Sequence, residues 1–118
     1  MKAIIIEDEK LSAEHLTHLL KKIDTSIEVV ATFDTVKKSI EAFEKGINAD
    51  VLFVDVHLAD GISFDIFSKT TIDTPIIFTT AYDEYAIKAF TLNSVDYLLK
   101  PIGIEDLKRA LEKFKKIN

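Results

Sequence analysis

Five short apolar runs, none of which alternates with polar residues, constrain the fold of this chain more than any other feature. The runs are residues 3–6, 29–31, 51–54, 76–78 and 97–99. Continuous apolar runs of this length are typical of strands that are buried on both faces, as in a parallel sheet. A parallel sheet needs crossover connections, so helices are expected between the runs.

Segments with helical spacing do lie between the runs. Three amphipathic stripes are clear: Leu16, Leu19, Leu20 and Ile23; Val36, Ile40, Phe43 and Ile47, with Gly46 as a helix stop; and Leu107, Ala110, Leu111 and Phe114. Two weaker segments cover residues 63–69 and 83–92, the second with Ala86, Ala89 and Phe90 inward and Asp83 as its N-cap. Strand and helix therefore alternate five times, which predicts a single doubly wound α/β domain over residues 1–118, ending near Ile117.

Composition narrows the function classes. The 118 residues carry a net charge of −5, which argues against a nucleic-acid-binding face spread over the domain. The chain has no cysteine, so disulfides and thiolate chemistry are excluded. The first apolar run is too short for a signal peptide or a membrane span, which predicts a soluble cytoplasmic protein without membrane contact.

Polar residues follow four of the five apolar runs. They are Glu7-Asp8, Asp55, Thr79-Thr80 and Lys100-Pro101. In an open α/β sheet, ligands bind outside the carboxyl ends of the strands, so these side chains are expected in one crevice if the first and third strands are neighbours. Three carboxylates in one crevice repel one another unless they take up protons or a cation offsets their charge. Mg²⁺ suits oxygen ligands and leaves room for phosphate oxygens, and Lys100 and Thr80 complete a set suited to phosphoryl transfer.

Each residue taken alone has an ordinary structural explanation. Asp55 could cap a turn, Glu7-Asp8-Glu9 could begin a helix, Thr80 could be a plain strand residue, and Lys100 a surface charge. The functional interpretation depends on all of them falling at strand ends in the order given.

Four motifs together resemble the response regulator receiver family along the whole chain. The motifs are Ile6-Glu7-Asp8-Glu9, Leu52-Phe53-Val54-Asp55-Val56-His57-Leu58, Phe78-Thr79-Thr80-Ala81 and Asp96-Tyr97-Leu98-Leu99-Lys100-Pro101. Residues 58–61 and 79–90 further resemble receivers that carry a LytTR-type DNA-binding output domain. The resemblance implies a flavodoxin-like fold with a five-stranded parallel sheet in the order 2-1-3-4-5.

The resemblance also implies a role for individual residues. Asp55 would accept a phosphoryl group from a sensor histidine kinase. Mg²⁺ would be bound by Asp8 directly, by Glu7 mainly through water, by Asp55 and by the backbone carbonyl of His57. Thr80 would hydrogen-bond the phosphoryl group and Lys100 would pair with it.

The same resemblance implies a switch and its output. Thr80 and Tyr97 would move on phosphorylation and remodel the face formed by the fourth helix, fifth strand and fifth helix, through which such domains dimerise. The Lys100-Pro101 bond would be cis. DNA would be contacted only through an output domain that these residues do not include.

Three positions depart from the common receiver pattern. Glu7 stands where many receivers have Asp, and Ala59 where Pro is common. Tyr82 is bulky and follows Thr80-Ala81, so we hypothesise that it shields the acyl phosphate from water; an unchanged dephosphorylation rate in Tyr82→Ala would exclude this role.

Several other polar residues are expected to be structural. His15 and His18 suit a solvated helix face, and Lys113, Lys115 and Lys116 suit a helix end near its dipole. The His57 ring is a minor candidate as a metal ligand, because strand alternation points it to the side of Asp55.

Two other functions remain open from the sequence. One is a Mg²⁺-dependent phosphohydrolase with an aspartyl phosphate, although such enzymes usually have their nucleophile after the first strand and a second Asp two residues on, where this chain has His57. The other is a degenerate receiver that binds partners without phosphorylation. A P-loop or dinucleotide-binding protein is excluded by the missing Gly-rich motifs.

Overall fold

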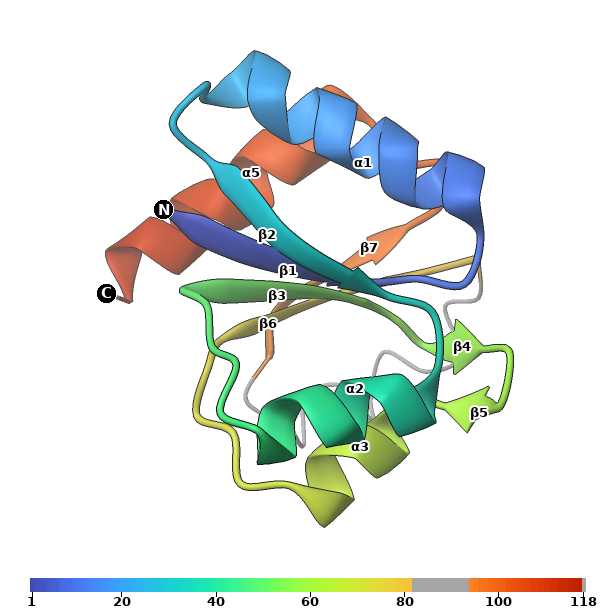
Figure 1. The fold of residues 1–118 in the computed structure, drawn as a ribbon. Helices are drawn as coiled ribbons and strands as arrows, with labels where there is room; N and C mark the ends of the chain where they lie inside the picture. Colours follow the sequence, from blue (N-terminus) through green and yellow to red (C-terminus); the bar gives the residue numbers. More distant parts are fainter. Residues whose placement is uncertain (82–93, 118) are drawn as a thin grey trace.

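A computed structural model of the chain describes residues 1–81 and 94–117 and contains a five-stranded parallel sheet at its centre (Figure 1). The strands are β1 (Lys2–Ile6), β2 (Glu28–Phe33), β3 (Val51–Asp55), β6 (Ile76–Thr80) and β7 (Ser94–Leu99). Their order in the sheet is β2-β1-β3-β6-β7, and every neighbouring pair is parallel. The predicted order is therefore confirmed, with the first and third strands side by side.

Helices cover both faces of the sheet. Helices α1 (Lys10–Ile23) and α5 (Ile104–Lys116) lie on one side, and α2 (Val36–Glu44) and α3 (Phe64–Lys69) lie on the other (Figure 1). Successive residues of one strand pack on the two faces of the sheet in turn. Ala3 and Ile5 belong to the core under α1 and α5, whereas Ile4 and Ile6 belong to the core under α2 and α3. The lack of alternation in the central strands follows from these two cores, because both faces of residues 3–6, 51–55 and 76–80 are buried.

The helices differ from the predicted stripes at their ends. Helix α2 ends at Glu44 and is followed by Gly46 at φ +93°, a left-handed conformation that glycine adopts without a steric penalty. Ile47 lies beyond this turn, although the stripe had included it, and it still packs on the core under α2. Helix α5 ends at Lys116, one residue short of the predicted end. The predicted helix over 83–92, with Asp83 as its cap, lies outside the described residues.

A small hairpin after β3 was not predicted. Its strands are β4 (His57–Leu58) and β5 (Gly61–Ile62), which pair antiparallel with His57 opposite Ile62 and Leu58 opposite Gly61. No alternation of apolar and polar residues in this stretch is long enough to indicate so short a pair of strands. The hairpin joins the carboxyl end of β3 to α3 and begins two residues after Asp55.

The described residues include no helix of the length and apolar character needed to cross a membrane.

Burial on the sheet makes a prediction about stability. Ile4→Ala removes three carbons from a side chain with no exposed surface, so the free energy of unfolding should fall by about 2–5 kcal/mol. Leu11→Ala is the matched control, because Leu11 is 80% exposed and its truncation should change stability by less than about 0.5 kcal/mol. Urea denaturation followed by circular dichroism measures both, and equal losses would contradict the two-core description.

Candidate functional site

The carboxyl ends of four strands bring the candidate site together. Glu7 and Asp8 follow β1, Asp55 ends β3, Thr80 ends β6, and Lys100 follows β7. The strand register aligns them, because Ile6 lies opposite Val54, Asp55 opposite Thr79, and Thr80 opposite Leu99. Residues that are up to 93 positions apart in the chain are thus neighbours. The predicted crevice at the switch point of the sheet is present.

Lys100 lies between two of the carboxylates. Its Nζ donates a hydrogen bond to Oε1 of Glu7 at 2.5 Å and another to Oδ2 of Asp55 at 2.9 Å. A third carboxylate, that of Glu9, is 3.8 Å away and far more exposed to solvent. The Lys100 side chain is only 16% exposed, so the two short ion pairs are screened much less than surface pairs.

Three acidic side chains face one another beside this lysine. Carboxylate oxygens of Glu7, Asp8 and Asp55 lie within 4.8 Å of one another, and these three residues form the group in the described part of the chain that could hold a metal ion. Glu7 and Asp55 are each 6% exposed, whereas Asp8 is open to solvent. Oxygen donors alone, with one ligand reachable from water, fit a hard divalent cation such as Mg²⁺.

The charges of the site alter its protonation. Burial, with a smaller contribution from the charge of Asp55, raises the pKa of Glu7 from 4.5 to about 7 against the opposing hydrogen bond from Lys100. Burial by itself would lower the pKa of Lys100, but its hydrogen bonds to Glu7 and Asp55 outweigh that effect and raise the pKa above its usual value. The lysine therefore stays charged at neutral pH, and the charged form of Glu7 is disfavoured by its burial.

A cleft of about 240 Å³ opens beside these groups. Its lining combines acidic, basic and hydroxyl side chains: Asp8, Glu9, Asp55, His57, Thr80, Ala81 and Lys100. Backbone hydrogen bonds hold its walls together, because the amide of Lys100 donates to the carbonyl of Thr80 at 2.7 Å and the amide of Val56 donates to that of Thr79 at 3.1 Å. An incoming anion in this cleft would meet a carboxylate, an ammonium group and a hydroxyl.

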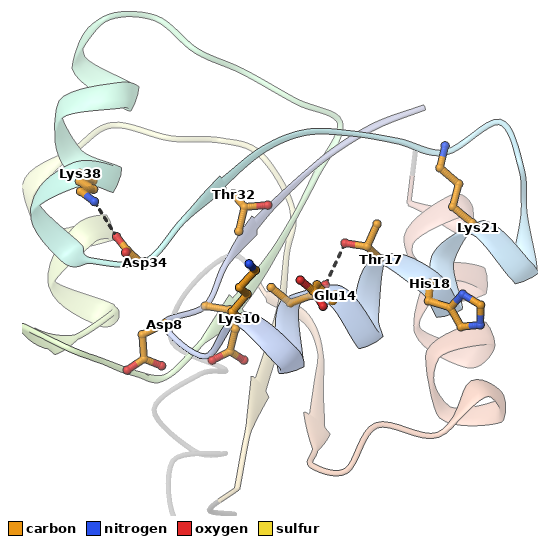
Figure 2. Close-up of a pocket in the computed structure, with 11 residues that line it drawn as sticks. Asp8, Lys10, Glu14, Thr17, His18, Lys21, Thr32, Asp34 and Lys38 are labelled. Atoms are coloured by element: carbon orange, nitrogen blue, oxygen red, sulfur yellow. Dashed lines mark hydrogen bonds and ion pairs between the residues drawn. The ribbon is translucent and has the colours of Figure 1, made fainter.

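A larger groove adjoins the cleft without sharing its chemistry. It has a volume of about 780 Å³, runs between α1 and β2, and meets the cleft at Asp8 (Figure 2). Its lysines and acids are mixed along its length, and one pair, Lys38 and Asp34, is joined at 3.1 Å (Figure 2). The side chains there do not converge on one point, so the smaller cleft is the chemical site.

Other sequence predictions have mixed outcomes. The Lys100-Pro101 bond is cis, as predicted. Tyr97 is partly buried on β7 and packs against the core under α2 and α3. Tyr82, the hypothesised shield of the acyl phosphate, lies outside the described residues. The His57 ring borders the cleft, but His57 does not belong to the acidic metal group found among the described residues.

Residues expected to be structural also make contacts that the sequence did not indicate. His15 and His18 are exposed on α1 as expected, yet Nε2 of His15 lies 3.2 Å from the carbonyl of Ile102, two residues after Lys100. Lys113 pairs with Asp96 of β7 at 3.3 Å and so ties α5 to the sheet. Such pairings depend on loop geometry, for which the sequence carries no periodic signal.

Comparison with known proteins agrees with this geometry. A family model described as "Response regulator receiver domain" matches residues 3–112. "Transcriptional regulatory protein LytR" of Staphylococcus aureus is 42% identical over 117 residues, which are 96% of this chain and 46% of that protein. "Sensory transduction protein LytT" of Bacillus subtilis is 35% identical over all of this chain and 49% of its own length. The chain thus spans about half the length of the curated relatives it matches.

A solved structure has the same fold. The response regulatory domain of protein mrkE from Klebsiella pneumoniae superposes with a TM-score of 0.83 at 31% identity, over 99% of this chain and 97% of that one. The family match covers the whole sheet and all four strand ends that form the site. The chain belongs to the receiver domain family of two-component response regulators, in which phosphorylation controls a switch.

Proposed function

We propose that Asp55 is the phosphoacceptor of this receiver and takes its phosphoryl group from a phosphohistidine of a sensor histidine kinase. The observation that carries the proposal is the position of the Asp55 carboxylate, 2.9 Å from the Lys100 ammonium and in the acidic group with Glu7 and Asp8. A carboxylate nucleophile beside a fixed cation has the arrangement that phosphoryl transfer requires.

Mg²⁺ is the proposed cofactor. Asp8 and Asp55 would bind it directly, Glu7 mainly through water, and the backbone carbonyl of His57 would supply a further oxygen. Bound there, the ion would offset the charge of the carboxylates and of the phosphoryl oxygens. The oxygen-only donor set supports this assignment, because three carboxylates converge beside Lys100.

The transfer step uses the side chains of this chain as follows. A carboxylate oxygen of Asp55 attacks the phosphorus atom, the phosphorus–nitrogen bond of the donor breaks, and the electron pair stays on the leaving imidazole nitrogen. Lys100 keeps its positive charge throughout and pairs with a phosphoryl oxygen in place of the Asp55 oxygen. The Thr80 hydroxyl, at the wall of the cleft, donates a hydrogen bond to the same group.

The proposed switch begins at the carboxyl ends of β6 and β7. Thr80 and Lys100 are joined through the backbone at 2.7 Å, so a movement of Thr80 toward the phosphoryl group would be transmitted to the end of β7, where Tyr97 lies. The affected face would include β7 and α5, and it would serve a homodimer of the phosphorylated form; the predicted helix over 83–92 that would complete this face lies outside the described residues. We regard the chain as a phosphoacceptor switch rather than an enzyme with a separate substrate.

The DNA-binding output of the regulator is proposed from the names and lengths of the relatives. Two of them are named a transcriptional regulatory protein and a sensory transduction protein, and each is about twice the length matched here. We propose that residues 1–118 are the receiver of a longer cytoplasmic regulator whose LytTR-type domain contacts DNA.

The phosphoacceptor assignment predicts a specific mass change. With Mg²⁺ and acetyl phosphate, the intact protein should gain one phosphoryl group, and chelation with EDTA should prevent the gain. Asp55→Asn should gain none, because an amide is not a nucleophile at phosphorus. Asp34→Asn, an exposed acid on the neighbouring groove, is the control and should react like the wild type. Continuous hydrolysis of phosphomonoesters would instead indicate a phosphohydrolase, and no gain by the wild type would indicate a degenerate receiver.

The raised pKa of Glu7 predicts a pH-dependent stability in the metal-free protein. Because the folded pKa of about 7 exceeds the unfolded value of 4.5, the folded state binds this proton more tightly. The resulting stabilisation is complete below the unfolded pKa and is lost as the pH rises through the folded pKa. Glu7→Gln mimics the protonated form, so its advantage in unfolding free energy over the wild type should grow by about 2 kcal/mol between about pH 5 and about pH 8.

Urea unfolding in EDTA measures this difference. Glu9→Gln is the control, because the Glu9 carboxylate is 70% exposed and its removal should give no such pH trend. Saturating Mg²⁺ should reduce the advantage of Glu7→Gln, since the ion offsets the same charge. An advantage that is unaffected by both pH and Mg²⁺ would refute this electrostatic description.

A further inference from the structure

The hairpin β4–β5 lies against the start of α2, on the side of the sheet where the site opens (Figure 1). It is the segment that connects Asp55 to α3, and it includes His57, which borders the cleft. Its two-residue turn consists of Ala59 and Asp60. The path of this short segment therefore decides where the backbone of His57 lies relative to Asp55.

Asp60 binds the hairpin to the first turn of α2 with both carboxylate oxygens. The amide of Val36 donates to Oδ1 at 2.6 Å, and the amide of Lys37 donates to Oδ2 at 3.1 Å. These amides are the first two of the helix and have no partner within it. The next amide, that of Lys38, donates to the side chain of the N-cap Thr35 at 3.0 Å. Helix α2 is thus capped by two residues, one of its own and one from the hairpin.

Packing supports the same contact. Leu58 of the hairpin and Val36 of α2 are 7% and 8% exposed and belong to one core. Gly61 has φ +150°, a conformation that L side chains rarely adopt, and a Cβ there would lie 3.9 Å from the Val36 side chain. The hairpin therefore packs beside Val36 through the backbone of Gly61 and the buried side chain of Leu58.

The turn between β2 and α2 also contacts the segment that carries Glu7. The amide of Glu7 donates to the carbonyl of Phe33, the last residue of β2, at 2.8 Å. Three residues later, Val36 donates to Asp60. One rigid turn thus supports both the segment that carries Glu7 and the segment that carries His57.

We propose that Asp60 is a positioning residue of the metal site, which anchors the His57 backbone through its two hydrogen bonds to α2. The inference rests on the proposed function, because it assumes that the His57 carbonyl and the acidic group bind Mg²⁺. Asp60 itself does not touch the ion. Supporting groups of this kind commonly change metal affinity by about 10-fold or more when they are removed.

The test compares two truncations at the same helix end. Asp60→Ala removes the bridge between the hairpin and α2, and Thr35→Ala removes the internal cap of α2 without touching the hairpin. Calorimetric titration with Mg²⁺ should show a dissociation constant about tenfold higher for Asp60→Ala. Thr35→Ala should stay within about twofold of the wild type, although both variants lose a cap and should have lowered melting temperatures.

Asp60→Asn separates geometry from charge. Its amide oxygen can still accept a hydrogen bond from α2, so its Mg²⁺ dissociation constant should lie within about threefold of the wild type. If Asp60 acted only as a remote negative charge, the Asn variant would bind Mg²⁺ as weakly as the Ala variant. Asp60→Glu keeps the charge but lengthens the side chain, so it should displace the hairpin and weaken Mg²⁺ binding. This variant takes the place of Asp60→Ala in the test if the Ala variant fails to fold.

Phosphorylation by acetyl phosphate gives a second readout. In Asp60→Ala the Mg²⁺ concentration for half-maximal rate should rise about tenfold, while the rate at saturating Mg²⁺ should stay within about twofold of the wild type. Overlapping Mg²⁺ titrations of Asp60→Ala and the wild type, or equal weakening in Asp60→Ala and Thr35→Ala, would overturn the role of Asp60 alone. A wild-type protein that binds no Mg²⁺ and gains no phosphoryl group would instead overturn the proposed function, and this inference with it.

Discussion

The position of one ammonium group between two buried carboxylates underlies the rest of this structure. Lys100 contacts Glu7 and Asp55 at 2.5 and 2.9 Å, and the three residues come from three different strand ends. Without the lysine, two nearly buried negative charges would face each other in a region of low polarity. The lysine offsets the repulsion between these strand ends, so the same contact serves both folding and the proposed chemistry.

The sheet and the chemical residues were predictable from the sequence for a physical reason. A strand buried on both faces must be apolar throughout, so its end is visible where the first charged residue appears, as at Glu7 and Asp55. Once the first and third strands are neighbours, those ends must converge. The assignment of Lys100 and Thr80 to the same crevice needed the further rule that all carboxyl ends of a parallel sheet share one edge.

The hairpin and the hydrogen bonds that hold the site in place were not predictable in the same way. The hairpin that carries His57 is only six residues long, and the Asp60 bridge joins it to an amide 24 positions earlier in the chain. Residues 58–61 match a stretch seen in related receivers, but no periodicity indicates the hairpin or its bridge to α2, because a carboxylate in a turn can cap any helix start that comes within reach. Likewise, the contact of His15 with Ile102 depends on the path of the loop after Lys100. Sequence reasoning thus brought the candidate site residues into one crevice but did not indicate the residues that hold them in place.

The carboxylate charges and the backbone hydrogen bonds around them explain how the site can be stable and still bind a cation. Burial raises the pKa of Glu7 to about 7, so the negative charge of this carboxylate is disfavoured and a bound proton or cation would stabilise it. The backbone around it, by contrast, is fixed by Phe33 on one side and by Asp60 on the other. A site whose backbone is already held by these hydrogen bonds would bind a cation with little further ordering of the chain. The free energy of cation binding then remains available to balance the charge of an incoming phosphoryl group.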